Sequence, residues 1–182
     1  GKTLTSIAAQ DALGLPADVV VPASLRANFA KELKKHHKGK RPETDIQSMQ
    51  NVATKGLPPK KDMLIVDEAH RARDPASKTY QTLKKNTSKK RLLLSGTPFY
   101  NRPSDISSLV NLAAGENVLP SQQSEFEKKY VALEKVNPGL VARLRGVKPG
   151  IRTGLNPKSA KELGGILKKW VDYHEGSKEN FP

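Results

Sequence analysis

Three short, uninterrupted apolar runs constrain the fold of this 182-residue chain more than any other feature. They end at Val21, Val66 and Leu94, and their sequences are DVVV, MLIV and RLLL. Strands that are apolar on both sides are typical of parallel sheets whose two faces are covered by helices. Segments with helical spacing separate the runs, so strands and helices alternate along the chain. We therefore predict an α/β fold in which helices flank a parallel sheet.

The helices are predicted from apolar residues that recur three or four positions apart. Gly14 is expected to end the first helix, and Pro103 to occupy the first position of another, where its missing N–H does no harm. Residues 45–53 are ambiguous and fit a short strand followed by a turn of helix, and the Gly- and Pro-rich residues 137–157 are expected to form an extended linker or insertion. The predicted helices are residues 4–13, 24–37, 76–83, 103–113, 121–133 (with a serine cap) and 159–174.

Two adjacent carboxylates follow the second apolar run. In the segment LIVDEAH the strand ends at Val66, and Asp67, Glu68 and His70 come after it. Ligands of α/β proteins bind at the carboxyl edge of the sheet. At that edge Asp67 is placed to hold Mg²⁺, and Glu68 to position and deprotonate an attacking water molecule. A helix cap formed by Asp67 would leave the paired carboxylate unexplained, so we favour a phosphoryl-transfer site in which His70 senses the terminal phosphate.

Small hydroxylated residues follow the third apolar run. Ser95, Gly96 and Thr97 stand in the segment LLLSGTP, at the same predicted edge of the sheet. Their hydroxyl groups can form hydrogen bonds toward the carboxylate pair and so link the state of the site to the rest of the domain. Taken alone, the segment also fits a Gly-Thr-Pro turn with a serine cap.

The sequence opens with Gly1, Lys2 and Thr3, which match the end of the phosphate-loop pattern G-x-x-x-x-G-K-[ST]. In that pattern glycine lets backbone N–H groups approach the phosphates, lysine reaches the β- and γ-phosphates, and the threonine hydroxyl ligates Mg²⁺. A tripeptide alone also occurs by chance. It gains weight here from the carboxylate pair that follows it along the chain.

The composition favours a polyanionic partner. The chain has 32 Lys and Arg against 18 Asp and Glu, a formal net charge of +14, as expected of a nucleic-acid-binding protein or of a merely soluble basic surface. Cysteine is absent, which excludes disulfides and cysteine-ligated metals. The sequence shows neither a long apolar span nor a signal pattern, so we expect an intracellular protein that does not enter a membrane.

Together these segments resemble motifs I, Ia, II and III of superfamily-two helicases, in order and in spacing. The matching segments are GKT, VVVPASLRANFAKEL, LIVDEAHRARDPASK and RLLLSGTPFYNRPSDISSLVNL. The Val-Pro-Ala-Ser-Leu segment, the DEAH-R stretch and the S-G-T-P-x-x-N signature are similar to the Swi/Snf-like branch of double-strand DNA translocases. The resemblance implies a RecA-like, ATP-binding lobe over residues 1–115, followed by a mostly helical, basic extension over residues 116–182.

The resemblance also implies roles for single residues. Gly1, Lys2 and Thr3 would bind the ATP phosphates, and Thr3 and Asp67 would hold Mg²⁺. Asp67 and Glu68 would carry catalysis, and nucleotide state would be coupled to the lobe through His70, Ser95, Gly96 and Thr97. Duplex DNA is the implied partner, with Pro22, Ala23 and Ser24 near its backbone, where the Ser24 hydroxyl can donate to a phosphate. The basic residues 34–41 fit a DNA-facing or a solvated surface equally well.

The same resemblance implies that the chain is a fragment. It lacks the start of the phosphate loop, the strand before that loop, and a second RecA-like lobe with its arginine finger. The resemblance implies that the missing strand lies beside residues 63–66, so we expect the strand at Met63–Val66 to lack a central neighbour. We therefore expect the chain alone to fold marginally and bind ATP poorly. Two alternatives to the DNA-dependent motor remain: the motor lobe of a restriction-type translocase, and a nucleic-acid-binding module that does not hydrolyse ATP.

Overall fold

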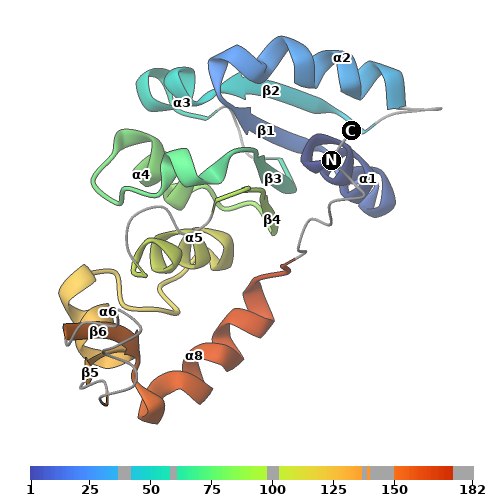
Figure 1. The fold of residues 1–182 in the computed structure, drawn as a ribbon. Helices are drawn as coiled ribbons and strands as arrows, with labels where there is room; N and C mark the ends of the chain where they lie inside the picture. Colours follow the sequence, from blue (N-terminus) through green and yellow to red (C-terminus); the bar gives the residue numbers. More distant parts are fainter. Residues whose placement is uncertain (37–41, 58–60, 98–102, 137–138, 140–149, 174–182) are drawn as a thin grey trace. The chain divides into compact units, whose positions relative to one another are not determined.

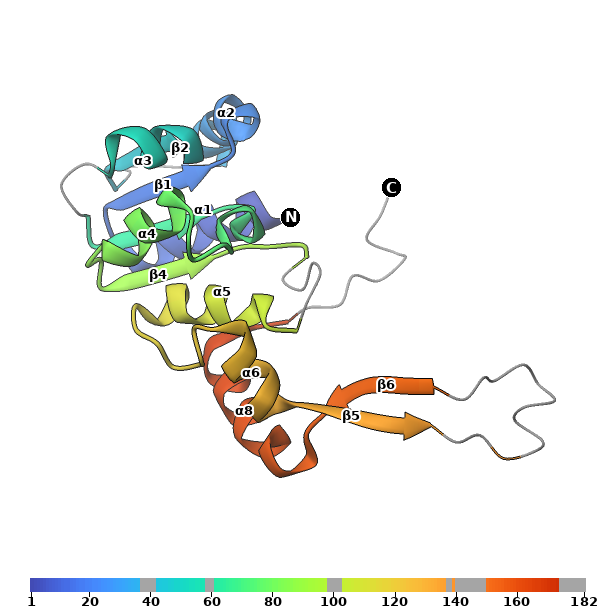
Figure 2. The ribbon, with the colours of Figure 1, turned by 90° about the vertical axis from the view of Figure 1, so that its left-hand side faces the viewer.

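The structure is a computed structural model that describes residues 1–36, 42–57, 61–97, 103–136, 139 and 150–173. The chain divides into two compact units, Gly1–Ser121 and Gln122–Pro182, and Figures 1 and 2 show the elements of each. Three sequence features lie outside the described residues: Pro98 and Asn101 of the S-G-T-P-x-x-N signature, and residues 37–41 of the basic run.

A four-stranded parallel sheet forms the centre of the first unit (Figure 1). The predicted α/β fold class is thereby confirmed. The strand order β2-β1-β3-β4 differs from the order along the chain, so every connection crosses over a face of the sheet. The strands are β1 (Ala17–Val21), β2 (Thr44–Ser48), β3 (Met63–Val66) and β4 (Lys90–Leu93).

The expectation that β3 lacks a neighbour is wrong. β3 pairs in parallel with β1 on one side, with Val19 opposite Ile65, and with β4 on the other, with Ile65 opposite Leu92. All of its residues are buried, as are those of β1. Within the described residues the edge strands are β2 and β4, each of which pairs on one side only, and residues Arg91–Leu93 of β4 are only half-buried. The carboxylate pair is therefore carried by a fully paired inner strand.

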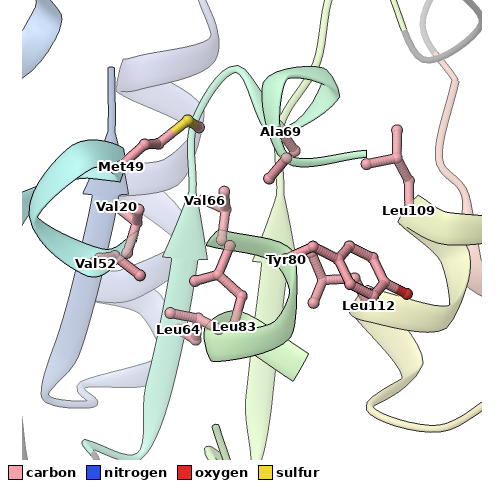
Figure 3. Packing of buried hydrophobic residues seen from close by; sticks show 11 residues of the cluster. Val20, Met49, Val52, Leu64, Val66, Ala69, Tyr80, Leu83, Leu109 and Leu112 are labelled. Carbon is pink, nitrogen blue, oxygen red and sulfur yellow. The ribbon is translucent and has the colours of Figure 1, made fainter. Parts of the chain in front are cut away.

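Alternate residues of the strands face two different cores. Val19, Val21 and Ile65 pack with Ile7 and Phe29, which belong to α1 (Lys2–Leu13) and α2 (Arg26–His36). On the opposite face Val20, Leu64 and Val66 pack with residues of three further helices, as Figure 3 shows. These helices are α3 (Met49–Lys55), α4 (Lys78–Lys85) and α5 (Asp105–Ala114).

Most predicted elements of this unit are present with shifted ends. Gly14 ends α1 in the left-handed conformation, with φ of 62°, as expected. The ambiguous residues 45–53 form the predicted strand and then the predicted helix, as parts of β2 and α3. Pro103 does not open α5, because that helix begins at Asp105 after Ser104. Two short 3-10 helices complete the unit: η1 (Ala23–Leu25), directly before α2, and η2 (Ala69–Ala72) after β3.

The second unit contains α6 (Gln123–Tyr130), a hairpin of β5 (Val131–Val136) and β6 (Gly150–Leu155), and α8 (Pro157–Trp170). Two expectations are corrected here. The helix predicted for residues 121–133 ends at Tyr130 and begins after Gln122 without a serine cap, and residues 150–155 of the predicted linker are a strand. The antiparallel pairing of Val131 with Leu155 and Leu133 with Thr153 converts both segments to strands (Figure 2).

Among the described residues, no helix is both long enough and apolar enough to cross a lipid bilayer.

Candidate functional site

The ends of β1, β3 and β4 meet at one edge of the sheet. The N–H of Asp67 donates to the carbonyl of Val20 at 2.9 Å, and the N–H of Leu94 donates to the carbonyl of Val66 at 2.9 Å. Beyond the ends of β3 and β4, the N–H of Ala69 donates to the carbonyl of Leu94 at 2.8 Å. The segments after β3 and β4 are therefore held together by backbone hydrogen bonds, and the residues that follow each strand lie close to one another.

Asp67 and Glu68 occupy this edge in different environments. Asp67 is 3% exposed, and its Oδ1 accepts the N–H of Glu68 at 2.9 Å. Glu68 is half-buried and is the only described residue other than glycine with positive φ, at 51°. Non-glycine residues rarely adopt this left-handed conformation, which clusters at functional sites. The chain turns sharply at Glu68, so the two carboxylates are presented to the same space.

Burial raises the pKa of Asp67 above its usual value, and the neighbouring Glu68 charge adds to that effect. The Glu68 N–H and the Lys2 ammonium act in the opposite direction, because both stabilise the ionised carboxylate. A buried carboxylate with a raised pKa gains from a further cation, since a cation offsets the cost of removing the charge from water.

Lys2, in the first turn of α1, reaches one of the two carboxylates. Lys2 Nζ lies 3.0 Å from Glu68 Oε1, with side chains 39% and 22% exposed. Gly1 is the residue before α1, at its N-cap position. Lys2, Thr3, Asp67 and Glu68 all line one pocket of about 210 Å³. Residues of the GKT and LIVDEAH segments, which are more than 60 positions apart in the sequence, thus line the same pocket.

His70 connects Glu68 to Ser95. His70 Nδ1 lies 3.3 Å from Glu68 Oε2 and 3.1 Å from Ser95 Oγ, which also accepts the Thr97 N–H at 3.2 Å. Burial lowers the pKa of His70, although the Glu68 charge opposes the shift. A neutral imidazole next to a carboxylate carries its proton on the nitrogen that faces the carboxylate, here Nδ1. The imidazole therefore joins Glu68 to the segment that follows β4.

Gly96 lies close to Lys2. A Cβ built on Gly96 would stand 3.2 Å from Lys2 Nζ, a tight contact that the lysine side chain would have to relieve by moving. Gly96 and Thr97 are both exposed. The predicted coupling residues therefore reach the site in two ways. His70 contacts Glu68 and is itself contacted by Ser95, whereas Gly96 lies beside the lysine that pairs with Glu68.

The predicted nucleic-acid residues lie at the end of β1. Pro22 is buried, whereas Ala23 and Ser24 are exposed within η1. Ser24 does not cap α2, since that helix begins at Arg26. Its hydroxyl is thus on an exposed segment beside the site.

Three residues that sequence reasoning missed complete the pocket wall: Leu25, Asn28 and Phe29. Leu25 ends η1, and Asn28 and Phe29 lie at the start of α2. Both elements come after the end of β1, which pairs in parallel with β3, the strand that precedes Asp67. Leu25 and Phe29 contribute only to the apolar spacing that predicts the helix over residues 24–37, and Phe29 is 2% exposed. Asn28 is an exposed polar residue on a helix, and such residues carry no signal in a single sequence.

The donor set suits Mg²⁺ together with a polyphosphate. Mg²⁺ prefers oxygen ligands and is commonly bound through one or two carboxylates, waters and substrate phosphates. The described residues contain no group of three acidic, His or Cys side chains that could enclose a metal by themselves. Asp67 and Thr3 could therefore hold this ion only with oxygens of a ligand and of water, as in nucleotide sites.

A family model, a curated protein sequence and solved structures that are similar to this chain all carry SNF2 in their descriptions. The family model described as "SNF2-related domain" matches residues 45–168. The SNF2 domain-containing protein CLASSY 3 of Arabidopsis thaliana is 31% identical over 115 residues, which are 63% of this chain and 7% of that protein. The DNA repair protein rhp54 of Schizosaccharomyces pombe is 43% identical over 68 residues, 37% of this chain and 8% of the relative. This chain thus spans a small part of each curated relative.

A solved structure shares the fold. The Sulfolobus solfataricus SWI2/SNF2 ATPase core in complex with double-stranded DNA superposes with a TM-score of 0.63 over 93% of this chain and 37% of that chain, at 21% identity. The resemblance found in the motifs is confirmed by the match of the family model to more than half of the residues. The chain belongs to the family of SNF2-related domains.

Proposed function

We propose that this chain is the ATP-binding and ATP-hydrolysing motor lobe of a DNA-dependent ATPase that moves along duplex DNA. The observation that carries the proposal is the meeting of Lys2, Thr3, Asp67 and Glu68 around one pocket at the carboxyl edge of a parallel sheet. A cation, a hydroxyl and two carboxylates are the groups that phosphoryl transfer to water requires.

Binding of the phosphates falls to the start of α1. Its backbone N–H groups and the Lys2 ammonium attract phosphate oxygens, because a helix N-terminus carries partial positive charge. Mg²⁺ held by Thr3, Asp67 and the phosphates would neutralise the charge that develops on the transferred group. Asp67 gains from this ion, since burial disfavours its ionised form.

Hydrolysis requires a base for the attacking water, and Glu68 is the residue placed to serve. Its Oε1 pairs with Lys2 at 3.0 Å. When phosphate oxygens compete for the Lys2 ammonium, the Glu68 carboxylate is released to accept a proton from water. This exchange of partners links activation of the base to the arrival of ATP.

His70 and Ser95 transmit the state of Glu68. His70 Nδ1 contacts both Glu68 and Ser95 Oγ, so a movement of Glu68 changes the hydrogen bond between η2 and the segment after β4. A neutral imidazole suits this role because it can donate to one partner at a time. Gly96 and Thr97, next to Ser95, belong to the same coupling segment.

Duplex DNA is the proposed partner. The net charge of +14 favours a polyanion, and the structurally similar Sulfolobus solfataricus core is a complex with double-stranded DNA. Ala23 and Ser24 are exposed at the end of β1, where the Ser24 hydroxyl can donate to a backbone phosphate. Contacts of this kind carry no base information, so binding is expected to be independent of sequence and sensitive to salt.

We also propose that the lobe works within a longer protein. The chain makes up 7% of CLASSY 3 and 37% of the Sulfolobus solfataricus core. A second RecA-like lobe in the same polypeptide would close on the ATP bound by residues 1–115, and residues 116–182 would lead toward it along the chain. Without that second lobe, residues 1–182 are expected to turn over little ATP.

The test is phosphate release by the full-length protein with and without duplex DNA. ATP hydrolysis that DNA stimulates supports the proposal. Equal rates in both conditions would remove the DNA-dependent motor, and ATP binding without turnover would identify a module that does not hydrolyse ATP. Single-stranded DNA and duplex RNA of the same length serve as controls for the proposed duplex-DNA partner.

A further inference from the structure

Helix α8 of the second unit carries its lysines on one face. Lys158, Lys161, Lys168 and Lys169 are all exposed. At 100° per residue they fall within one sector of the helix. The opposite sector holds Leu163, which is 6% exposed, and the half-buried Ile166, Leu167 and Trp170. We call the four residues Lys158, Lys161, Lys168 and Lys169 the α8 lysine face.

The acidic residue next to this face is already neutralised. Glu162 Oε1 lies 2.8 Å from Lys129 Nζ of α6 and accepts the Tyr130 hydroxyl at 3.0 Å. These two partners lower the pKa of Glu162, so its carboxylate stays ionised and paired with Lys129. The α8 lysine face therefore presents net positive charge.

A stabilising effect on the helix itself accounts for only two of the four lysines of the α8 lysine face. Lys168 and Lys169 are in the last turn, where cations interact favourably with the helix dipole. Lys158 is in the first turn, where a cation is unfavourable, and Lys161 follows it three positions later, so the two like charges repel each other. The first turn contains no acidic residue. These two lysines lower the stability of the helix that carries them, which points to another use for their charge.

Two adjacent glycines add to this local cost. Gly164 and Gly165 lie inside α8, where glycine is unfavourable by about 1 kcal/mol relative to alanine. A Cβ built on either of them would meet nothing within 4 Å, so packing does not require glycine at these positions. Gly165 lies in the sector of the lysines, between Lys161 and Lys168. Its missing side chain lets an extended ligand approach the helix backbone closely.

We propose that the α8 lysine face binds the phosphate backbone of duplex DNA, as a contact separate from the site at the end of β1. The inference rests on the proposed function in taking DNA as the partner. From Lys158 to Lys169 the helix rises about 16 Å at ~1.5 Å per residue, a length that spans about five base pairs at ~3.4 Å each. The lysines lie at both ends of the face with an exposed glycine between them. This spacing suits the extended phosphate backbone of DNA better than a compact anion.

The test compares three variants of the full-length protein in binding a duplex of random sequence at several salt concentrations. The double variant Lys158→Gln and Lys161→Gln removes the two lysines that helix stability does not explain. The control double variant Lys78→Gln and Lys85→Gln removes the same charge from exposed positions of α4. The third variant, Gly165→Gln, leaves the charge unchanged and fills the centre of the face with a better helix former.

The first variant is expected to weaken DNA binding and to make the log–log salt slope shallower by up to about 1.8, at about 0.9 for each phosphate that the protein no longer neutralises. Gly165→Gln is expected to weaken binding while raising the melting temperature, an outcome that a purely structural role of α8 would not give. Equal losses in the α4 control would show a general effect of net charge and overturn the inference.

Unchanged affinity and slope in both α8 variants would also overturn the inference and leave an acidic protein as the remaining partner for this face. Failure of the wild-type protein to bind DNA would instead reject the proposed function. The DNA-stimulated ATPase separates the two results further. Loss of the α8 contact is expected to raise the DNA concentration that gives half-maximal stimulation while leaving the maximal rate unchanged.

Discussion

The two ends of the parallel sheet carry similar residues in different arrangements. At the carboxyl end, the buried Asp67 lies with Glu68 beside a lysine, Lys2, around a pocket. At the amino end, the buried Asp18 of β1 lies near a lysine, Lys61, and its Oδ2 accepts the Lys61 N–H at 3.3 Å. Burial raises the pKa of both aspartates. Composition alone does not distinguish the two clusters.

The difference lies in the partners of the two lysines. Lys61 Nζ lies between Glu43 Oε1 at 2.6 Å and Asp45 Oδ2 at 3.1 Å, so two carboxylates of the protein neutralise its charge. Within the described part of the chain, Lys2 pairs with one carboxylate, that of Glu68, and it lines an open pocket. A lysine shared with one carboxylate can be drawn to a phosphate, whereas a lysine between two carboxylates cannot. We therefore expect Lys2, at the carboxyl end of the sheet, to serve catalysis, and Lys61, at the amino end, to stabilise the fold.

Glu68→Gln gives the largest expected effect. The amide keeps the shape of the side chain but cannot accept a proton, and loss of a general base lowers turnover by about 10²–10⁴-fold. ATP binding should stay within a few-fold of wild type. Steady-state ATPase rates and equilibrium binding of a fluorescent ATP analogue measure the two quantities. A variant that hydrolyses ATP at nearly the wild-type rate would show that another group is the base.

The matched pair Lys2→Met and Lys61→Met tests the comparison directly. Lys2→Met removes a charged contact to phosphate, worth about 1.5–3 kcal/mol, so the Kd for Mg·ATP should rise about 10- to 150-fold. Lys61→Met should leave that Kd unchanged and lower the melting temperature, because it leaves Glu43 and Asp45 without their cation. Isothermal titration and thermal melts measure both effects. Equal loss of ATP binding in the two variants would erase the distinction between the two ends.

Ser95→Ala has a smaller expected effect. It removes the hydroxyl that contacts His70 Nδ1, and one such hydrogen bond is worth about 0.5–1.5 kcal/mol. We expect DNA stimulation of the ATPase to fall by about 2- to 10-fold while the basal rate and ATP affinity hold. Ser88→Ala is the matched control, since the Ser88 hydroxyl bonds to the Lys61 carbonyl at the amino end of the sheet. A lowered basal rate without loss of stimulation would place Ser95 in hydrolysis and not in coupling.

The carboxyl end of the sheet could be predicted from sequence because its signals are local. Asp67 and Ser95 each follow an apolar run, and parallel strands end at a common edge. The order of the strands is not local, and the sequence contains nothing that places β1 and β4 on the two sides of β3. The expectation of a missing neighbour for Met63–Val66 was wrong for this reason.

The hairpin of the second unit was missed for a similar reason. Residues 131–136 read VALEKV, in which Ala, Leu, Glu and Lys all favour helix. Their conversion to strand depends on pairing with residues 150–155, across a segment with many Gly and Pro residues. Strand formation here is decided by the partner and not by intrinsic preference. Asn28 was missed because only the fold brings the start of α2 to the pocket.

Asp18→Asn has the smallest expected effect, and it acts on stability alone. Among the described residues, Asp18 Oδ1 is the one buried side-chain oxygen without a hydrogen-bond partner. Because its pKa is raised from 3.8 in the folded protein, the native state binds more protons than the unfolded state between pH 3.8 and the raised pKa. The free energy of unfolding therefore falls as pH rises through this window and stays lower above it. The amide introduced by the substitution does not ionise, so the variant lacks this fall.

The expected result is a difference in unfolding free energy, variant minus wild type, that grows as pH rises from 4 to 7. Asp67 titrates in the same direction, but it is present in both proteins and cancels in the difference. Urea unfolding at several pH values measures the effect, and the DNA-stimulated ATPase of Asp18→Asn should equal that of wild type. A difference that does not vary with pH would show that the buried Asp18 carboxyl has an ordinary pKa. A loss of ATPase activity would show that the amino end of the sheet takes part in function after all.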